Sequence, residues 1–113
     1  MNPDRLTRLL EFYEQDPDDA FTQFAIAREY VKRSEPERAL SFFETLVEGQ
    51  PAYTGTYYHL GKLYEQLGRR DDAVATYRKG IEVSRERRQL KDLSELQDAL
   101  VQAQGIGFDE EFE

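Results

Sequence analysis

Few residues of this sequence have types and spacings that could support catalysis or metal binding. His59 is the single histidine and no cysteine is present, so a metal site would need carboxylates and a serine nucleophile would have one possible base. The acidic run 16–19 (Asp-Pro-Asp-Asp) lacks the glycine and final glutamate of a calcium-binding loop, and helix capping explains it better. A phosphate-binding glycine loop follows a strand, whereas no strand is predicted before residues 105–107 (Gly-Ile-Gly). The sequence therefore predicts no catalytic residue, no metal site and no cofactor.

The charge balance of the chain restricts its partners. It has 113 residues, with 15 Lys and Arg against 23 Asp and Glu, a formal net charge of −8. The phosphates of nucleic acids and anionic membranes would repel such a chain, so we expect neither as a partner. Apolar residues (39%) and aromatic residues (12%) suffice for a packed core in one domain. Because it has no cysteine, no signal-peptide pattern and no apolar run of about 18 residues, we expect a cytoplasmic protein.

The elements that must position any functional side chain follow from an internal repeat. Residues 20–53 align with residues 54–87 at an offset of 34, and side-chain size and polarity agree at many aligned positions. Residues 4–17 match the second half of the unit, and residues 89–103 carry leucines at helical spacing. The identical pairs are Thr22/Thr56, Tyr30/Tyr64, Ala39/Ala73 and Glu48/Glu82. A half-repeat, two full repeats and a closing helix are therefore predicted.

Each repeat contains two apolar stretches with the spacing of amphipathic helices, separated by a polar break. In the first repeat, Ser34 and Glu37 have the pattern of a capping box, which predicts Ser34 as the N-cap of the second helix. Gly68 is expected to end the corresponding helix of the second repeat with a positive φ. Asp18 or Asp19 is expected to cap the helix that opens the first repeat. About six helices joined by short turns are predicted.

At these positions the chain resembles the tetratricopeptide repeat family, whose unit is a 34-residue helix–turn–helix. The family signature is a bulky residue, then Leu-Gly, Tyr, Ala and an aromatic residue, and residues 57–77 are similar to it. Gln23 stands where the signature has a large aromatic residue, and Arg85 stands where it has a proline, so the helix from Asp71 could continue through residues 85–88 (Arg-Glu-Arg-Arg). The packing residues that the resemblance implies are Ile26, Ala27, Tyr30, Ala39, Phe43, Tyr57, Leu60, Gly61, Tyr64, Ala73 and Tyr77.

The resemblance implies an all-α fold, a right-handed superhelix of antiparallel helix pairs whose first helices line a concave groove. The expected helical repeat domain covers residues 1–104, followed by an acidic tail at 105–113. Within the domain we expect the half-repeat 4–17, the repeats 20–53 and 54–87, and the capping helix 89–103.

The family's ligand contacts lie on the first helix of each unit, on the face that includes Phe21 and Ala25 here. Ala25 and His59 stand where the chaperone-adaptor members have asparagines, so we do not expect binding of a chaperone C-terminal tail. Aromatic side chains with cations are the composition expected of a peptide-binding hot spot. The alternative is that the aromatic rings fill gaps between helices and the cations are only solvated. The candidate partner-binding residues are Phe24, Arg28, Lys32, Tyr58, His59 and Lys62.

The function that the resemblance implies is a non-catalytic scaffold or adaptor that binds a peptide or helix of a partner protein, and an acidic peptide is the first candidate ligand. The alternative is a self-assembling structural subunit that forms homo-oligomers through its groove, cap or tail. A monomer or a weak homo-oligomer agrees with either function. The tail also has two interpretations. It is either a solvated acidic end, or a segment whose Phe108 and Phe112 dock in a cationic groove of its own chain or of a neighbouring copy.

Overall fold

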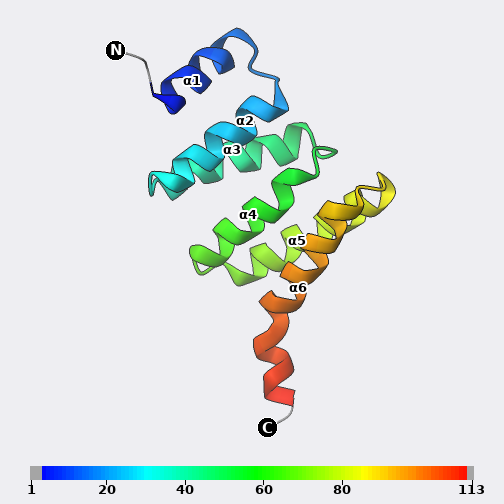
Figure 1. Ribbon diagram of the computed structural model, residues 1–113. Helices are drawn as coiled ribbons and strands as arrows, with labels where there is room; N and C mark the ends of the chain where they lie inside the picture. The colour runs from blue at the N-terminus through cyan, green and yellow to red at the C-terminus, as the bar shows by residue number, and fades with distance from the viewer. Residues whose placement is uncertain (1–3, 112–113) are drawn as a thin grey trace. The chain divides into compact units, whose positions relative to one another are not determined.

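The computed structural model describes the backbone of residues 4–111 and the side chains of residues 4–105. The described residues form six α-helices and no strand, which confirms the predicted all-α repeat fold (Figure 1). None of these helices combines the length and apolar character that crossing a bilayer requires. The helices are α1 (Arg5–Gln15), α2 (Ala20–Lys32), α3 (Pro36–Gly49), α4 (Gly55–Gln66), α5 (Arg70–Glu86) and α6 (Leu90–Glu111).

The chain folds as two compact units whose boundary lies between Tyr53 and Thr54, where the sequence places the boundary between the repeats. In the first unit, α2 pairs with α3 and α1 packs against α2. Asp4 caps α1 by accepting a bond from the Thr7 N–H (2.9 Å), and Arg33 at the end of α2 pairs with Asp4 (3.1 Å). This ion pair ties the start of α1 to the end of α2.

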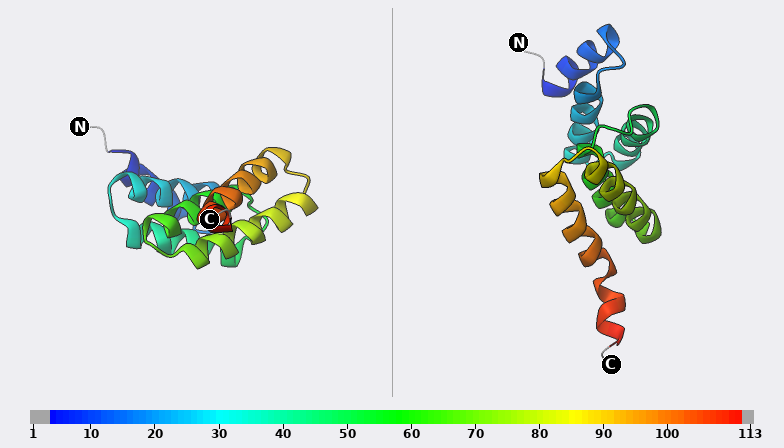
Figure 2. Two further views of the ribbon diagram at one scale, coloured as in Figure 1. Left: turned by 90° about the horizontal axis from the view of Figure 1, so that it is seen from below. Right: turned by 90° about the vertical axis from the view of Figure 1, so that its right-hand side faces the viewer.

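The second unit is a packed group of three helices, α4, α5 and α6 (Figure 2). Two glycines allow close approach within it. A Cβ at Gly61 of α4 would lie 2.1 Å from the Tyr77 ring, and one at Gly80 of α5 would lie 2.5 Å from Tyr57 Cβ and 2.9 Å from Leu96 Cδ1. Glycine is therefore needed at both positions for the helices to pack as they do.

The residues expected to pack the repeats lie in the interiors of the two units. Phe43, Tyr57 and Tyr77 are among the largest side chains that are completely buried. Gln23, in place of an aromatic residue, is also buried, and its amide donates to the Pro17 carbonyl (2.5 Å). A hydrogen bond to the α1–α2 connection thus replaces the aromatic contact. The other buried packing residues are Ile26, Ala27, Tyr30, Ala39, Leu60, Gly61, Tyr64 and Ala73.

The turn between α2 and α3 shows that the predicted capping box is wrong. Ser34 has a φ of 60°, and the N-cap of α3 is Glu35, whose side chain makes no capping bond. The N–H groups of Ser34 and Glu35 donate to the carbonyls of Val31 (3.1 Å) and Tyr30 (2.9 Å), which closes the end of α2. Because the Ser34 backbone ends one helix in a left-handed conformation, its side chain does not begin the next.

The same turn recurs at the ends of α4 and α5. Gly68 has the predicted positive φ, 75°, and Arg88 has a φ of 55°. After Ser34, Gly68 and Arg88 alike, the next helix begins two residues later. The connection from α5 to α6 therefore has the geometry of the turn within a repeat, so α5 and α6 form a further helix pair.

Both helices of that pair, α5 and α6, are longer than the corresponding helices of the repeats. Helix α5 has 17 residues where α3 has 14, but it ends at Glu86, so the expected continuation through Arg87 and Arg88 is wrong. The capping helix, expected over 89–103, instead runs from Leu90 to Glu111, so residues 105–107 (Gly-Ile-Gly), expected to begin the tail, are helical. Among the residues of α6 whose side chains are described, 90–105, Leu96, Ala99 and Ala103 are buried. The division into a domain 1–104 and a tail stays a prediction.

Replacing Arg88 by glycine is expected to stabilise the second unit by about 0.5–1 kcal/mol, because a left-handed conformation strains every residue with a Cβ. The urea midpoint of unfolding should therefore rise. The matched control is Gly68→Ala, which introduces a Cβ at the equivalent turn and should lower the midpoint. A lower midpoint for Arg88→Gly would show that the arginine side chain contributes more than its backbone strain costs.

Candidate functional site

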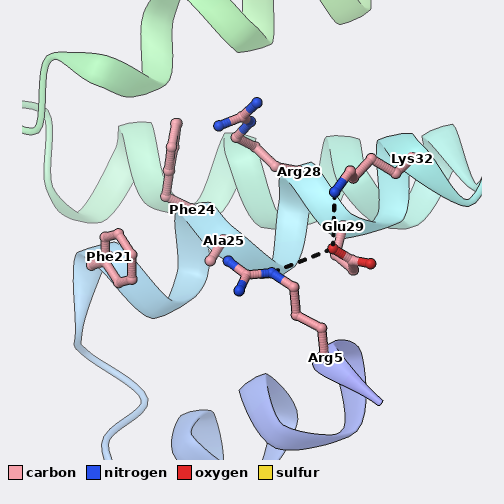
Figure 3. Close-up of a pocket in the computed structure, with 7 residues that line it drawn as sticks. All are labelled: Arg5, Phe21, Phe24, Ala25, Arg28, Glu29 and Lys32. Atoms are coloured by element: carbon pink, nitrogen blue, oxygen red, sulfur yellow. Dashed lines mark ion pairs between the residues drawn. The ribbon is translucent and has the colours of Figure 1, made fainter.

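A cleft between α1 and α2 is the best-defined candidate site in the described part of the chain (Figure 3). Its volume is about 300 Å³, the lower end of the range for ligand pockets. Arg5 comes from α1 and the other lining residues come from α2. We call it the Phe24 cleft; its lining residues are Arg5, Phe21, Phe24, Ala25, Arg28, Glu29 and Lys32.

Helix α2 places its lining residues on one face because they recur every three or four positions, from Phe21 through Arg28 to Lys32. The helix begins at Asp19, the predicted cap. The Asp19 carboxylate accepts bonds from the Thr22 hydroxyl (2.6 Å) and the Thr22 N–H (2.9 Å). These two bonds hold the pKa of Asp19 below its usual value. The start of the helix, and hence the register of the cleft face, is therefore well determined.

The electrostatics of the Phe24 cleft centre on Glu29. Its carboxylate lies 3.6 Å from Arg5 Nε, 4.0 Å from Lys32 Nζ and 3.6 Å from Arg33 Nε, so three cations share one acid (Figure 3 shows the first two pairs). Arg28, also in the cleft, forms no ion pair with any residue from 4 to 105. The cleft therefore carries more positive than negative charge on a chain whose net charge is −8.

Aromatic surface adjoins this positive charge. The Arg28 guanidinium lies 5.8 Å from the centre of the Phe24 ring, within the range of a cation–π interaction. Phe21 is 60% exposed at the side of the cleft. Phe21 and the Arg28 guanidinium line the same cleft, so a ligand lying along it could place an apolar part on one and an anionic part on the other.

The second unit repeats the aromatic–cation pair on α4. Lys62 Nζ lies 5.5 Å from the centre of the Tyr58 ring. The Tyr58 and His59 rings meet edge to face, with their centres 5.3 Å apart. Tyr58 and Lys62 are the residues that align with Phe24 and Arg28 at the offset of 34. We call Tyr58, His59 and Lys62 the Tyr58 patch.

The cation of the Tyr58 patch, Lys62, forms an ion pair with Glu65 of the same helix. The Glu65 carboxylate lies 3.8 Å from Lys62 Nζ and accepts a hydrogen bond from the Tyr77 hydroxyl. Burial, together with this carboxylate, raises the pKa of Tyr77 far above its usual value, so the hydroxyl keeps its proton and remains a donor. Lys62 is thus partly neutralised, whereas Arg28 is not, and the Phe24 cleft is the more electropositive of the two.

The structure brings the sequence-predicted residues together in two groups. Phe24, Arg28 and Lys32 line the Phe24 cleft, and the other three form the Tyr58 patch. Their participation in one groove stays a prediction. Sequence reasoning missed Arg5 and Glu29. Glu29 follows Arg28 directly and could have been found from helical spacing, but nothing in the sequence indicates that Arg5 of the half-repeat reaches α2.

No metal-binding group is found among the described residues, where no three His, Asp or Glu side chains converge. What the two sites offer is aromatic surface and positive charge, which suit recognition of an anionic, partly apolar ligand.

Comparison with known proteins supports the assignment of the repeats. The family model described as tetratricopeptide repeat matches residues 54–87, the second repeat. A crystal structure of a tetratricopeptide repeat domain protein from Salinibacter ruber is 60% identical, covering 77% of this chain and 97% of that one, with a TM-score of 0.75. A solution structure with the same description and source is also 60% identical, covering 80% and 91%, with a TM-score of 0.77.

More distant structures share the fold. A solution structure of a protein from Bordetella parapertussis is 22% identical, covers 90% of this chain and 89% of that one, and has a TM-score of 0.77. No curated protein sequence matches the chain.

Proposed function

Because this chain belongs to the tetratricopeptide repeat family, whose members generally act as protein interaction modules, we propose that it binds an acidic, aromatic-containing peptide of a partner protein. It does so without catalysing a reaction. The peptide's acidic side chains pair with the cations of the Phe24 cleft, and its apolar side chains pack on Phe21 and Phe24.

The observation that carries this proposal is the unneutralised charge of the Phe24 cleft. Three cations and one acid line it, and the acid is already shared with Arg33 outside the cleft. Arg28 keeps its charge beside an aromatic ring, where a carboxylate could approach it together with an apolar side chain. The aligned Tyr58 patch offers the same pairing on the second unit, which supports recognition by both repeats.

Substituting Arg28 and Lys62 together is expected to weaken peptide binding at least about tenfold, because each repeat loses its aromatic–cation pair. We would use Arg28→Glu with Lys62→Gln, since a glutamate at 62 would face Glu65. The probe is a short synthetic peptide in which phenylalanine alternates with aspartate and glutamate, titrated by calorimetry. The single variants Arg28→Glu and Lys62→Gln then measure how much the first and the second unit each contribute to the affinity.

The matched control is Lys79→Glu, which reverses an exposed cation of α5 outside both sites. Its affinity and the thermal midpoints of all variants should stay close to those of the unmodified chain, because exposed substitutions change stability little. Equal affinity of the double variant and the unmodified chain would refute the proposal, as would equal binding of a peptide with lysine in place of its acids.

A further inference from the structure

The C-terminal residues of this chain have the chemistry that the Phe24 cleft would bind. Residues 108–113 read Phe-Asp-Glu-Glu-Phe-Glu, with four acids and two phenylalanines in six residues. Phe108 and Phe112 are four residues apart, the spacing that places two side chains on the same face of a helix. No other segment of the sequence combines so many acids with aromatic residues over so short a length.

The backbone of α6 continues past the last buried side chain that the structure describes in this helix. Ala103 is the last residue with a buried side chain among those described, and its carbonyl accepts a bond from Arg70 Nε of α5 (2.7 Å). A Cβ at Gly105 would meet no atom within 4 Å. In Figures 1 and 2 the helix then projects beyond α4 and α5 to Glu111. The helix backbone at the start of the acidic segment therefore lies beyond α4 and α5.

The cleft and the segment are complementary in charge and in apolar character. Arg5, Arg28 and Lys32 supply three cations against Glu29, and Phe21 and Phe24 supply apolar surface. The segment supplies acids in excess of any cation, because residues 104–113 contain no lysine or arginine. Association of opposite charges on exposed surfaces is fast and is weakened by salt.

We propose that residues 105–113 of one copy bind in the Phe24 cleft of a second copy, so that chains associate head to tail. This inference rests on the proposed function, since it assigns a specific occupant to the same cleft. An interface between two different surfaces leaves one free cleft and one free tail in each dimer, so it permits longer assemblies. Partner peptide and tail then compete, and self-association keeps the cleft occupied until a partner displaces the tail.

The test is complementation between two defective full-length chains, measured by sedimentation velocity. The cleft variant is Arg28→Glu with Lys32→Glu, and the tail variant is Asp109→Lys with Glu110→Lys. The unmodified chain should gain mass with concentration and lose that gain at high salt. Each variant alone should remain monomeric, because the charges on one of the two interacting surfaces are reversed and the cleft and tail then repel each other. Mixed in equal amounts, they should form a dimer, as the intact tail of the cleft variant enters the intact cleft of the tail variant.

Matched controls carry the same charge changes elsewhere: Lys79→Glu with Lys91→Glu, and Glu48→Lys with Asp98→Lys, all exposed. Both should self-associate like the unmodified chain. A monomeric unmodified chain at all concentrations would overturn the proposal, as would mixed variants that stay monomeric, the result expected if the tail binds the cleft of its own chain. Oligomers that persist in either variant would place the interface elsewhere.

Failure of this inference can be separated from failure of the proposed function. The tail variant keeps an intact Phe24 cleft, so the synthetic acidic peptide should bind it at least as tightly as it binds the unmodified chain. Binding to the tail variant without self-association of the unmodified chain would leave the proposed function standing and refute the tail as occupant. Absence of peptide binding to the tail variant would refute both.

Discussion

Replacing Leu96 by alanine is expected to destabilise the second unit by about 2–5 kcal/mol, the usual cost of truncating a completely buried leucine. Leu96 lies on α6 with 0% of its surface exposed, and its Cδ1 lies against Gly80 of α5, where a Cβ would be 2.9 Å away. Tyr57 of α4 lies against the same glycine. Removing the leucine therefore leaves a cavity at the point where the three helices of the unit meet.

Hydrogen exchange is the measurement that localises this effect. Amides of α4, α5 and α6 should exchange faster in Leu96→Ala, because the free energy of opening falls in the unit that contains the cavity. The control is Val101→Ala, which shortens a side chain of the same helix that is 69% exposed and should change exchange little. If Leu96→Ala were as stable as Val101→Ala, α6 would not be a capping helix of the second unit.

Replacing Gly61 by alanine is expected to lower the free energy of unfolding by about 2 kcal/mol through overpacking. Two effects oppose each other here. Alanine favours a helix over glycine by about 1 kcal/mol, but a Cβ at this position would lie 2.1 Å from Cε1 and 2.6 Å from Cζ of Tyr77. The ring cannot move aside easily, because it is completely buried and its hydroxyl donates to Glu65. Overpacking therefore outweighs the helix propensity.

The double variant Gly61→Ala with Tyr77→Phe tests this explanation. Without its hydroxyl the ring is no longer held by Glu65, and it can shift to admit the methyl group. The two substitutions should therefore destabilise less together than the sum of the single effects, as measured by urea unfolding. Strict additivity would show that the hydrogen bond does not fix the ring. The first repeat is a natural precedent, since Ala27 and Phe43 occupy the aligned positions and both are buried.

Much of the fold could be predicted from the sequence because the repeated positions are interior positions. Ile26 and Leu60, or Phe43 and Tyr77, recur at an offset of 34 since each must fill the same gap between paired helices, and all of them are buried. Gly68 and Asp19 were likewise predictable, because the chemistry of a helix end is local. Ser34 was not, since the same residue could end one helix or begin the next, and the sequence pattern supports both.

The residues of the candidate site also fall into those that the sequence predicted and those that only the structure revealed. Phe24, Arg28 and Lys32 were found from the sequence because helical spacing alone brings them to one face. The cleft itself needs Arg5, which is distant in sequence and belongs to the half-repeat. Lys32 and Arg33 reach Glu29 from the next turn of the same helix, but the third cation that shares this acid, Arg5, depends on where α1 lies against α2. No local pattern encodes that placement.

The sequence by itself determined the family, the repeat, the interior residues and the aromatic–cation pairs, because each depends on spacing along one helix or on the fixed period of the unit. Only the tertiary structure showed which of the paired cations has a carboxylate beside it. Arg28 lies beside Phe24 without a carboxylate among the described residues, whereas Lys62 shares Glu65 with the Tyr77 hydroxyl. Glu65 follows Lys62 by one turn of α4, but its hydrogen bond with Tyr77 of α5, like the pairing of Arg5 of α1 with Glu29 of α2, depends on distances between helices, which packing sets.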